Sequence, residues 1–155
     1  MKHKISIIII SILLLATLAF IFSNSMQSIA QSQERSIRVM NSIQPLLEVI
    51  IGKGNVTDHL VRKLAHFFEF MAFGIELALL RAFCKKVRFQ SIINILFVGF
   101  AAAAMDETIQ LFTGRGSQVQ DIWLDFSGAL VGISFTLLIF LIINIIHRRV
   151  QLKNQ

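Results

Sequence analysis

The stretch AMDETIQLFTGRGSQVQDIWLD, residues 104–125, concentrates charge in a chain that is otherwise strongly apolar. The residues before it, 92–104, and after it, 126–146, are almost wholly apolar. Two apolar segments joined by a short polar connection with two glycines predict a pair of antiparallel helices whose charged residues meet at one end. The carboxylates of this stretch are Asp106, Glu107, Asp121 and Asp125.

The composition of the chain predicts an integral membrane protein. Of the 155 residues, 55% are hydrophobic and only 15% are charged, which leaves too little polar surface for a soluble domain of this length. The length suits one compact bundle, so we expect residues 1–155 to form a single domain. The formal charge of +6 comes largely from basic residues beside the apolar segments. Such residues orient membrane helices and contact anionic lipids, so we expect membrane lipids as partners and no nucleic acid.

Four apolar segments are each expected to form a transmembrane helix, at approximately residues 5–22, 64–83, 91–112 and 122–146. A helix needs about 20 apolar residues to cross a bilayer core of about 30 Å, and three of the segments satisfy this alone. The second segment contains several polar residues, so its assignment depends on the other three. The first has the basic start of a signal peptide, but its apolar run of about 18 residues exceeds the usual length of about 7–15 and favours a retained helix.

The outer connection, residues 23–57, has the pattern of an amphipathic helix. Its apolar residues recur near a 3.5-residue period, which predicts a helix lying on the outer membrane face or capping the bundle. Pro45 is expected to kink or divide this helix. Asp58 is expected to cap the start of the second transmembrane helix. The apolar positions are Ile37, Met40, Ile43, Leu47 and Ile50.

The distribution of Lys and Arg predicts the orientation of the chain. Basic residues precede the first helix, lie between the second and third, and follow the fourth, so all three groups fall on one side of a four-helix bundle. Because short basic segments stay in the cytoplasm, we expect a multi-pass protein of the cytoplasmic membrane with both termini cytoplasmic. The predicted fold class is all-α and polytopic: a four-helix transmembrane bundle with an extracytoplasmic amphipathic helix between helices one and two. The basic residues are Lys2, Lys4, Arg81, Lys85, Lys86, Arg88, Arg148, Arg149 and Lys153.

Charged residues of the second, third and fourth helices are predicted to lie at one depth. With a rise of about 1.5 Å per residue, His66 and Glu69 fall about 5–10 Å below the outer end of the second helix. Asp106 and Glu107 fall about 8–9 Å below the outer end of the third, and Asp125 lies about 5 Å into the fourth. A charge that faces hydrocarbon costs about 2.5–3.5 kcal/mol, so we expect these residues to face the bundle interior.

These five residues are the candidate catalytic residues, because a buried His beside a carboxylate can transfer a proton. In the outer loop, Gly114 and Gly116 flank Arg115, whose guanidinium can hold a phosphate or carboxylate by two bonds. The alternative for the whole set is a structural ion network. No cofactor is evident, although one His with carboxylates can hold the divalent cations Mg²⁺, Mn²⁺ or Ca²⁺. The candidate ligand-binding residues are Lys63, Gln110, Arg115 and Asp121.

Small residues in the third and fourth segments predict close helix packing. Gly128 and Gly132 form a GxxxG motif, which allows two helix backbones to approach each other. The alanines at 101–104 fit the same role. The Phe-rich run HFFEFMAF in the second segment is expected to fill the space between helices and not to recognise a ligand.

Three blocks of the sequence resemble the VanZ-like family of small bacterial membrane proteins. The first is FIFSNSMQ, residues 20–27. The second is RKLAHFFEFMAFG, residues 62–74, which is similar to the family's Lys-x-x-His-Phe-x-Glu-aromatic pattern. The third is DETIQLFTGRGSQVQDIWLDFSGALVG, residues 106–132, which is similar to its Asp-Glu-x-x-Gln, Arg, Asp and paired-Gly signature. Phe70 stands where the family often has Tyr, and Asp125 where it often has Asn, so the site lacks a hydroxyl and gains a charge.

The resemblance implies a link to glycopeptide resistance, chiefly to teicoplanin, in the bacterial cell envelope. Whether the protein is an enzyme is left undecided by the sequence. The outward polar layer could process an anionic lipid or a lipid-linked cell-wall precursor. It could instead bind such a component, or a glycopeptide-related ligand, as a sensor, chaperone or shield. A small transporter is the third alternative, but four helices are few and no inverted repeat is visible.

Overall fold

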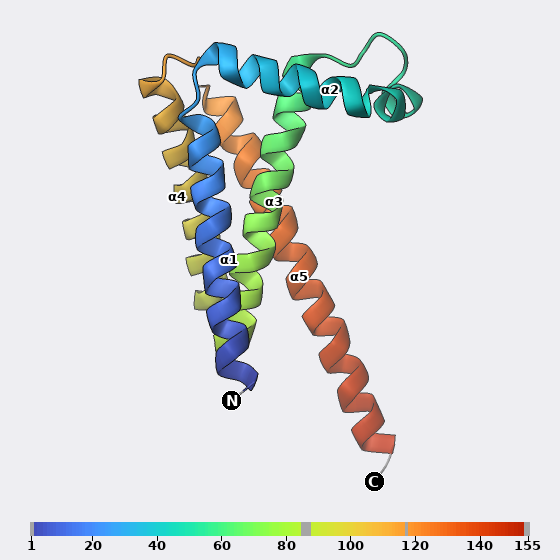
Figure 1. Ribbon diagram of the computed structural model, residues 1–155. Helices are drawn as coiled ribbons and strands as arrows, with labels where there is room; N and C mark the ends of the chain where they lie inside the picture. Colours follow the sequence, from blue (N-terminus) through green and yellow to red (C-terminus); the bar gives the residue numbers. More distant parts are fainter. Residues whose placement is uncertain (1, 85–87, 117, 154–155) are drawn as a thin grey trace.

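The computed structural model describes residues 2–84, 88–116 and 118–153, and every regular element in these ranges is an α-helix. Four of the helices pack as a bundle, and the fifth, α2, lies across one end of it (Figure 1). Both chain ends lie at the opposite end of the bundle from α2 (Figure 1). The all-α prediction and the extra helix after the first segment are therefore confirmed. In chain order the helices are α1 (Lys2–Ser25), α2 (Ile29–Ile51), α3 (Asp58–Cys84), α4 (Phe89–Phe112) and α5 (Val119–Lys153).

Three helices are long and apolar enough to cross a membrane: Lys4–Ser25, Phe89–Phe112 and Val119–Leu152. These correspond to the first, third and fourth predicted segments. The helix α3 has 27 residues, which is long enough, but Glu69 and Glu76 interrupt its apolar stretch. Length and composition therefore support three membrane-spanning helices in the described part of the chain, and the predicted fourth span does not follow from them.

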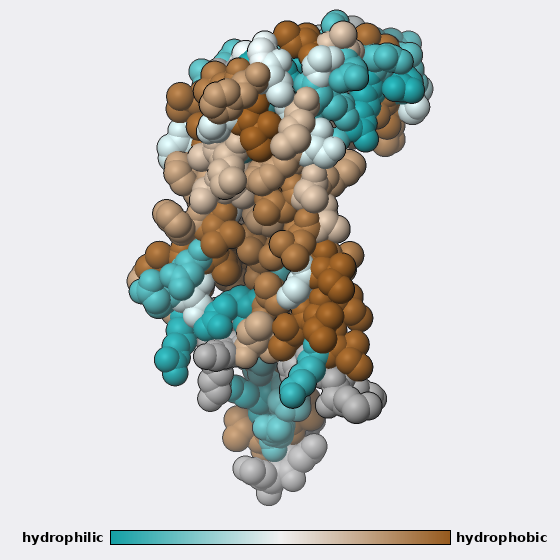
Figure 2. Space-filling view, turned by 60° about the vertical axis from the view of Figure 1, so that its left-hand side comes forward, coloured by the Kyte–Doolittle hydropathy of each residue, from teal (hydrophilic) through white to brown (hydrophobic). Residues whose placement is uncertain are grey.

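The outer surface of the bundle is apolar around its middle. Large side chains such as Leu15 on α1, Phe97 on α4 and Phe135 on α5 are 65%, 69% and 58% exposed. Figure 2 shows a broad hydrophobic band between two ends that carry the polar residues. Water would make so large an apolar surface unfavourable, whereas lipid chains cover it at no such cost. The molecule is therefore built to sit in a membrane.

The connection between α1 and α2 is held by local hydrogen bonds. Ser28 Oγ accepts a hydrogen bond from the Gln31 N–H at 3.4 Å, and the Ser28 N–H donates to Gln31 Oε1 at 3.1 Å. This reciprocal capping box satisfies two backbone donors at the start of α2. It fixes the point at which the chain turns from α1 into the crosswise helix.

The helix α2 packs against the bundle along one face. Met40, Ile43 and Leu47 are half-buried, as expected, but Ile37 and Ile50 remain exposed in the isolated chain. Pro45 lies inside a single helix and does not divide it. Proline has no backbone N–H to donate, so one helical hydrogen bond is absent there, yet α2 continues to Ile51.

Two helix ends differ from the sequence-based expectation. Thr57, and not Asp58, caps α3, because the Leu60 N–H donates to Thr57 Oγ1 at 3.2 Å. At the other end of the chain, α5 continues past Ile146 to Lys153, since the residues between them include no Gly or Pro to end the helix.

The basic residues beside the helices lie at the end of the bundle that is opposite α2. The last turn of α3 and the first turn of α4 lie at this end together with both termini (Figure 1). Arg81 belongs to the last turn of α3, and Arg88 immediately precedes α4. Lys85 and Lys86 belong to the same predicted group, but they lie outside the described residues.

The helices α3 and α5 approach each other so closely that only glycine fits at three positions. A Cβ atom built on Gly132 would lie 2.1 Å from the Met71 carbonyl oxygen, and one on Gly128 would lie 2.3 Å from that of Phe67. The contact is mutual, because a Cβ on Gly74 of α3 would lie 2.2 Å from the backbone oxygen of Ala129. The GxxxG prediction is therefore confirmed, and its partner helix is α3.

Gly132→Ala is expected to destabilise the bundle, whereas Gly99→Ala is not. Alanine is favoured over glycine inside a helix by about 1 kcal/mol, so a loss of stability reports packing and not helix propensity. The new methyl group at 132 would overlap the Met71 oxygen, while a methyl at 99 would lie an ordinary 3.4 Å from the Ala129 methyl. We expect Gly132→Ala to lower the free energy of unfolding in detergent by about 1–3 kcal/mol. Equal thermal midpoints for the two variants would contradict the close approach of α3 and α5.

Candidate functional site

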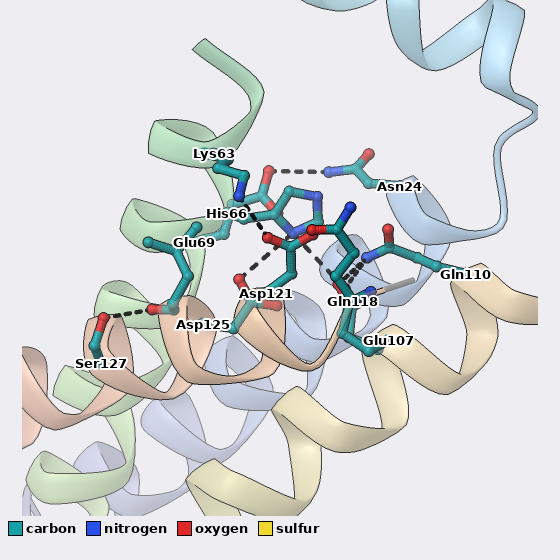
Figure 3. A network of polar contacts seen from close by, with 12 residues as sticks. Asn24, Lys63, His66, Glu69, Glu107, Gln110, Gln118, Asp121, Asp125 and Ser127 are labelled. Carbon is teal, nitrogen blue, oxygen red and sulfur yellow. Dashed lines mark hydrogen bonds and ion pairs between the residues drawn. The ribbon is translucent and has the colours of Figure 1, made fainter. Parts of the chain in front are cut away.

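Three helices bring a histidine and two aspartates together beneath α2, and Figure 3 shows two of these side chains, His66 and Asp125. His66 Nδ1 on α3 lies 3.7 Å from Asp106 Oδ2 on α4 and 3.9 Å from Asp125 Oδ1 on α5. Both carboxylates are buried, with exposed fractions of 0% and 1%. The two separations are too long for direct hydrogen bonds. These three side chains form the centre of the site, and they could share a cation.

Gln110 and the start of α5 hold the neighbouring carboxylates in position. Gln110 Nε2 donates to Asp106 Oδ2 and to Glu107 Oε1, each at 2.9 Å. The Gln118 N–H donates to Glu107 Oε2 at 3.3 Å. Glu107 thus accepts hydrogen bonds with both of its oxygens, one from its own helix and one from the residue just before α5. Gln110 lies three residues after Glu107 and four after Asp106, so its side chain can reach both carboxylates.

Lys63 and Asp121 form an ion pair at the rim of the site. The Lys63 Nζ lies 2.8 Å from Asp121 Oδ1, and it joins the outer parts of α3 and α5. Their side chains are 30% and 24% exposed, so solvent weakens the attraction between them. The pair lies one helical turn before His66 and Asp125 on the two helices, on the side of α2.

Asn24, at the outer end of α1, connects four elements. Its Nδ2 donates to Glu69 Oε1 on α3 at 3.1 Å, and its Oδ1 accepts from the Arg35 guanidinium on α2. The Asn24 backbone oxygen accepts from the Arg115 guanidinium, in the α4–α5 loop, at 3.1 Å. Sequence reasoning placed neither Asn24 nor Arg35 in the site. Asn24 could have been recognised as a site residue from its position, because it lies in residues 20–27, where the apolar first helix ends in polar residues.

Arg115 is a buried cation outside the membrane-spanning segments. Only 7% of the residue is exposed. Burial lowers the pKa of Arg115, and the nearby Arg62 charge lowers it further, but a guanidinium in a protein stays protonated. A buried guanidinium of this kind favours an anionic ligand beside it.

All of the predicted site residues except the fully buried Asp106 line two adjoining cavities beneath α2. The polar cavity has a volume of about 330 Å³. A second cavity, of about 270 Å³, lies between α1, α2 and α3, and its wall includes Glu69 and Arg35 together with apolar side chains. The two cavities share Arg62, His66 and Arg115. The polar cavity is also lined by Lys63, Glu107, Gln110, Asp121 and Asp125.

An apolar groove continues from the second cavity along the bundle. It runs between α1 and α3 and shares Phe20, Ala65 and Glu69 with that cavity. Ala16 and Ala72 extend it away from α2. The polar cavity, the second cavity and the apolar groove therefore adjoin one another in that order. Their walls become less polar from the charged centre of the site to the lipid-facing surface of α1 and α3.

A family model described as VanZ/LLP1 matches residues 8–144 of the chain. The chain belongs to the VanZ/LLP1 family. The matched range extends from α1 into α5, and every residue of the VanZ/LLP1 site named above lies within it. This VanZ/LLP1 chain matches no curated protein and no solved structure.

Glu107→Gln is expected to destabilise this VanZ/LLP1 protein more than Glu34→Gln. A glutamine at position 107 offers one acceptor oxygen where the carboxylate offers two, so its amide NH2 would face either the Gln118 N–H, which loses its acceptor, or the Gln110 NH2, which keeps only Asp106. An unsatisfied buried donor costs about 1–3 kcal/mol. Glu34 lies on the surface, where its 3.7 Å pair with Arg38 contributes little. Chemical denaturation in detergent measures both changes, and equal stability of the two variants would show that the buried network contributes nothing.

Proposed function

We propose that this VanZ/LLP1 protein is a four-span protein of the bacterial cytoplasmic membrane, with α3 as the fourth span. The two acidic residues within α3 are directed at polar partners on α1 and not at lipid. Glu69 accepts a hydrogen bond from Asn24 at 3.1 Å, and Glu76 accepts one from Thr17 Oγ1 at 2.9 Å. Acidic residues that face inward and are hydrogen-bonded are compatible with a membrane span. With the basic groups at the cytoplasmic end, α2 lies on the outer face and both termini are cytoplasmic.

This orientation predicts which residues a membrane-impermeant thiol reagent can modify on intact cells. In a background in which Cys84 is replaced by serine, Gln33→Cys on the exposed face of α2 should react, whereas Gln151→Cys near the end of α5 should react only after lysis. Labelling with a maleimide, followed by mass detection, measures both. Modification of position 151 from outside, or protection of position 33, would reverse the proposed orientation.

We further propose that the outer cavities bind an amphiphile with an anionic head group, such as an anionic lipid or a lipid-linked cell-wall precursor. The observation that carries this proposal is the continuity of the polar cavity with the apolar groove between α1 and α3. A charged head group fits beside Arg62, Lys63 and Arg115, and a hydrocarbon chain fits along Ala16 and Phe20 toward the lipid. Ligand sites of this type are mostly apolar, with a few polar groups that fix orientation.

The balance of charges in the cavity supports an anionic ligand at Arg115. The Lys63 charge is already matched by Asp121, and Glu107 is held by its own hydrogen bonds. Arg115, in contrast, donates to a neutral backbone oxygen. A phosphate or carboxylate beside it would gain a charge-assisted, two-bond contact. Membership of the VanZ/LLP1 family supports a role in the cell envelope, with a proposed link to glycopeptide resistance.

Arg115→Met is expected to weaken the binding of an anionic lipid, whereas Arg38→Met is not. Methionine keeps much of the side-chain volume but removes the charge at the junction of the two cavities, while Arg38 lies exposed on α2. We expect the dissociation constant for a polyprenyl phosphate in detergent to rise at least about tenfold, equivalent to about 1.4 kcal/mol. Native mass spectrometry or calorimetry measures the constant, and a polyprenol without phosphate is the matched ligand control. Equal affinities for the phosphate and the alcohol would rule out recognition of the head group.

The approach of His66 to two carboxylates supports a second candidate function, which is chemical processing of the bound ligand. A histidine beside a carboxylate can move a proton during hydrolysis or group transfer. Turnover of the polyprenyl phosphate by purified protein, lost in His66→Ala and Glu107→Gln, would establish processing. Full activity of both folded variants would exclude this chemistry and leave binding as the function.

A further inference from the structure

We infer that His66, Asp106 and Asp125 form a binding site for one divalent metal ion, in which Nδ1 of the histidine and one oxygen of each carboxylate are the ligands. This inference concerns metal binding alone and does not rest on the proposed lipid ligand. In the described part of the chain, no other group of three His, Cys, Asp or Glu residues meets the spacing needed for a shared metal ion.

The positions of the three ligand atoms suit a shared ion. They all lie within 4.8 Å of one another. Two ligands of one metal ion are separated by at most twice the metal–ligand distance, which gives about 4–5 Å for bonds of about 2.0–2.6 Å. The separations of 3.7 and 3.9 Å from His66 Nδ1 lie below that limit. Small rotations of the side chains would bring all three atoms onto one ion.

Four polar atoms of the three ligand side chains lack the hydrogen-bond partners that buried polar atoms normally have, whereas Asp106 Oδ2 accepts from Gln110. Among the described residues, no hydrogen-bond partner reaches His66 Nδ1, Asp106 Oδ1 or either carboxylate oxygen of Asp125. Asp125 is only 1% exposed. Unpaired carboxylates in such a position are unfavourable unless a cation or a proton neutralises them. The histidine and the two aspartates come from three different helices, so the arrangement is not a local cluster of acidic residues on one element.

The charged groups around Asp125 favour the binding of a cation. The charges that act most strongly on this carboxylate are those of other carboxylates: Asp106, Glu107, Asp121 and Glu69. Two of the basic side chains that line the polar cavity are engaged elsewhere, since Lys63 pairs with Asp121 and Arg115 donates to the Asn24 backbone oxygen. A divalent ion would replace mutual repulsion between Asp106 and Asp125 with attraction to both.

An outer hydrogen bond already orients one of the proposed ligands. Gln110 Nε2 donates to Asp106 Oδ2 at 2.9 Å, as the second layer around a metal site commonly does. His66 and Asp125 also line the polar cavity, so water or an anionic ligand could complete the coordination from that side. One imidazole nitrogen with two carboxylates suits Mn²⁺ or Zn²⁺ better than Ca²⁺ or Mg²⁺, which prefer oxygen ligands alone.

Metal titration of the purified full-length protein in detergent tests the site. After treatment with a chelator, we expect one Mn²⁺ per chain by calorimetry, and a rise in the thermal midpoint as the metal is added. Asp125→Asn and His66→Gln should weaken this binding by at least tenfold. Glu76→Gln is the matched control, because Glu76 is another acidic residue within the bundle that hydrogen-bonds to Thr17 and should leave the affinity unchanged. Absence of binding in the wild type, or equal binding by all variants, would overturn the inference.

Spectroscopy of the intact site tests whether His66 binds the metal, even if Asp125→Asn and His66→Gln fail to fold. Electron spin echo modulation of bound Mn²⁺ should show coupling to the nitrogen of one imidazole. The coupling should persist in a variant in which the other histidines, His3, His59 and His147, are all glutamine. Bound Mn²⁺ without nitrogen coupling, or coupling lost in the triple variant, would exclude His66 as a ligand. If a proton occupies the site in place of a metal ion, the titration will show no saturable metal binding, and the inference will be wrong.

Discussion

The contact between α3 and α5 determines the geometry of the site. Gly128 lies against the backbone of Phe67, which is the neighbour of His66, and Asp125 lies one turn before Gly128. A larger residue at that contact would push the two helices apart and carry the histidine away from the aspartate. The 3.9 Å separation of His66 and Asp125 therefore depends on residues that have no chemistry of their own. The backbone contact at Gly128 therefore positions His66 and Asp125, and no direct hydrogen bond joins their side chains.

Polar atoms near the α2 end of the bundle are satisfied mainly by other protein groups, both between helices and within α4. The side chain of Asn24 joins α1 to α2 and α3, its backbone oxygen reaches the α4–α5 loop, and Gln110 binds two carboxylates on its own helix. Lipid cannot supply hydrogen bonds, so each polar group within the membrane must find a partner in the protein. The atoms around His66, Asp106 and Asp125 depart from this rule. Exceptions of this kind in a well-connected network mark the places where a ligand or an ion is expected.

Sequence periodicity and helix rise predicted much of the fold, and the depth of the charged residues follows directly from the rise per residue. Counting residues along α3, α4 and α5 put His66, Asp106 and Asp125 at a common level, and the structure brings these three side chains together. The role of Asn24 could not be predicted in this way, because it depends on the direction in which α2 crosses the bundle. The cap at Thr57 was missed for a local reason: two adjacent residues, Thr57 and Asp58, are both good caps, and only the observed hydrogen bond distinguishes them. The charges within α3 likewise prevent its assignment as a span from composition.

The length of α5 has a consequence for how the molecule sits in its bilayer. The helix has 35 residues, about 53 Å at about 1.5 Å per residue, whereas its apolar part, 126–146, covers about 32 Å, close to a hydrocarbon thickness of about 30 Å. The remaining length carries polar residues at both ends of α5, which is inclined to α1 in the bundle (Figure 1). All side chains from 141 to 152 are exposed in the chain. The last turns of α5 therefore extend beyond the apolar stretch and present Arg148 and Arg149 at the depth of the lipid head groups, where anionic lipids favour basic side chains.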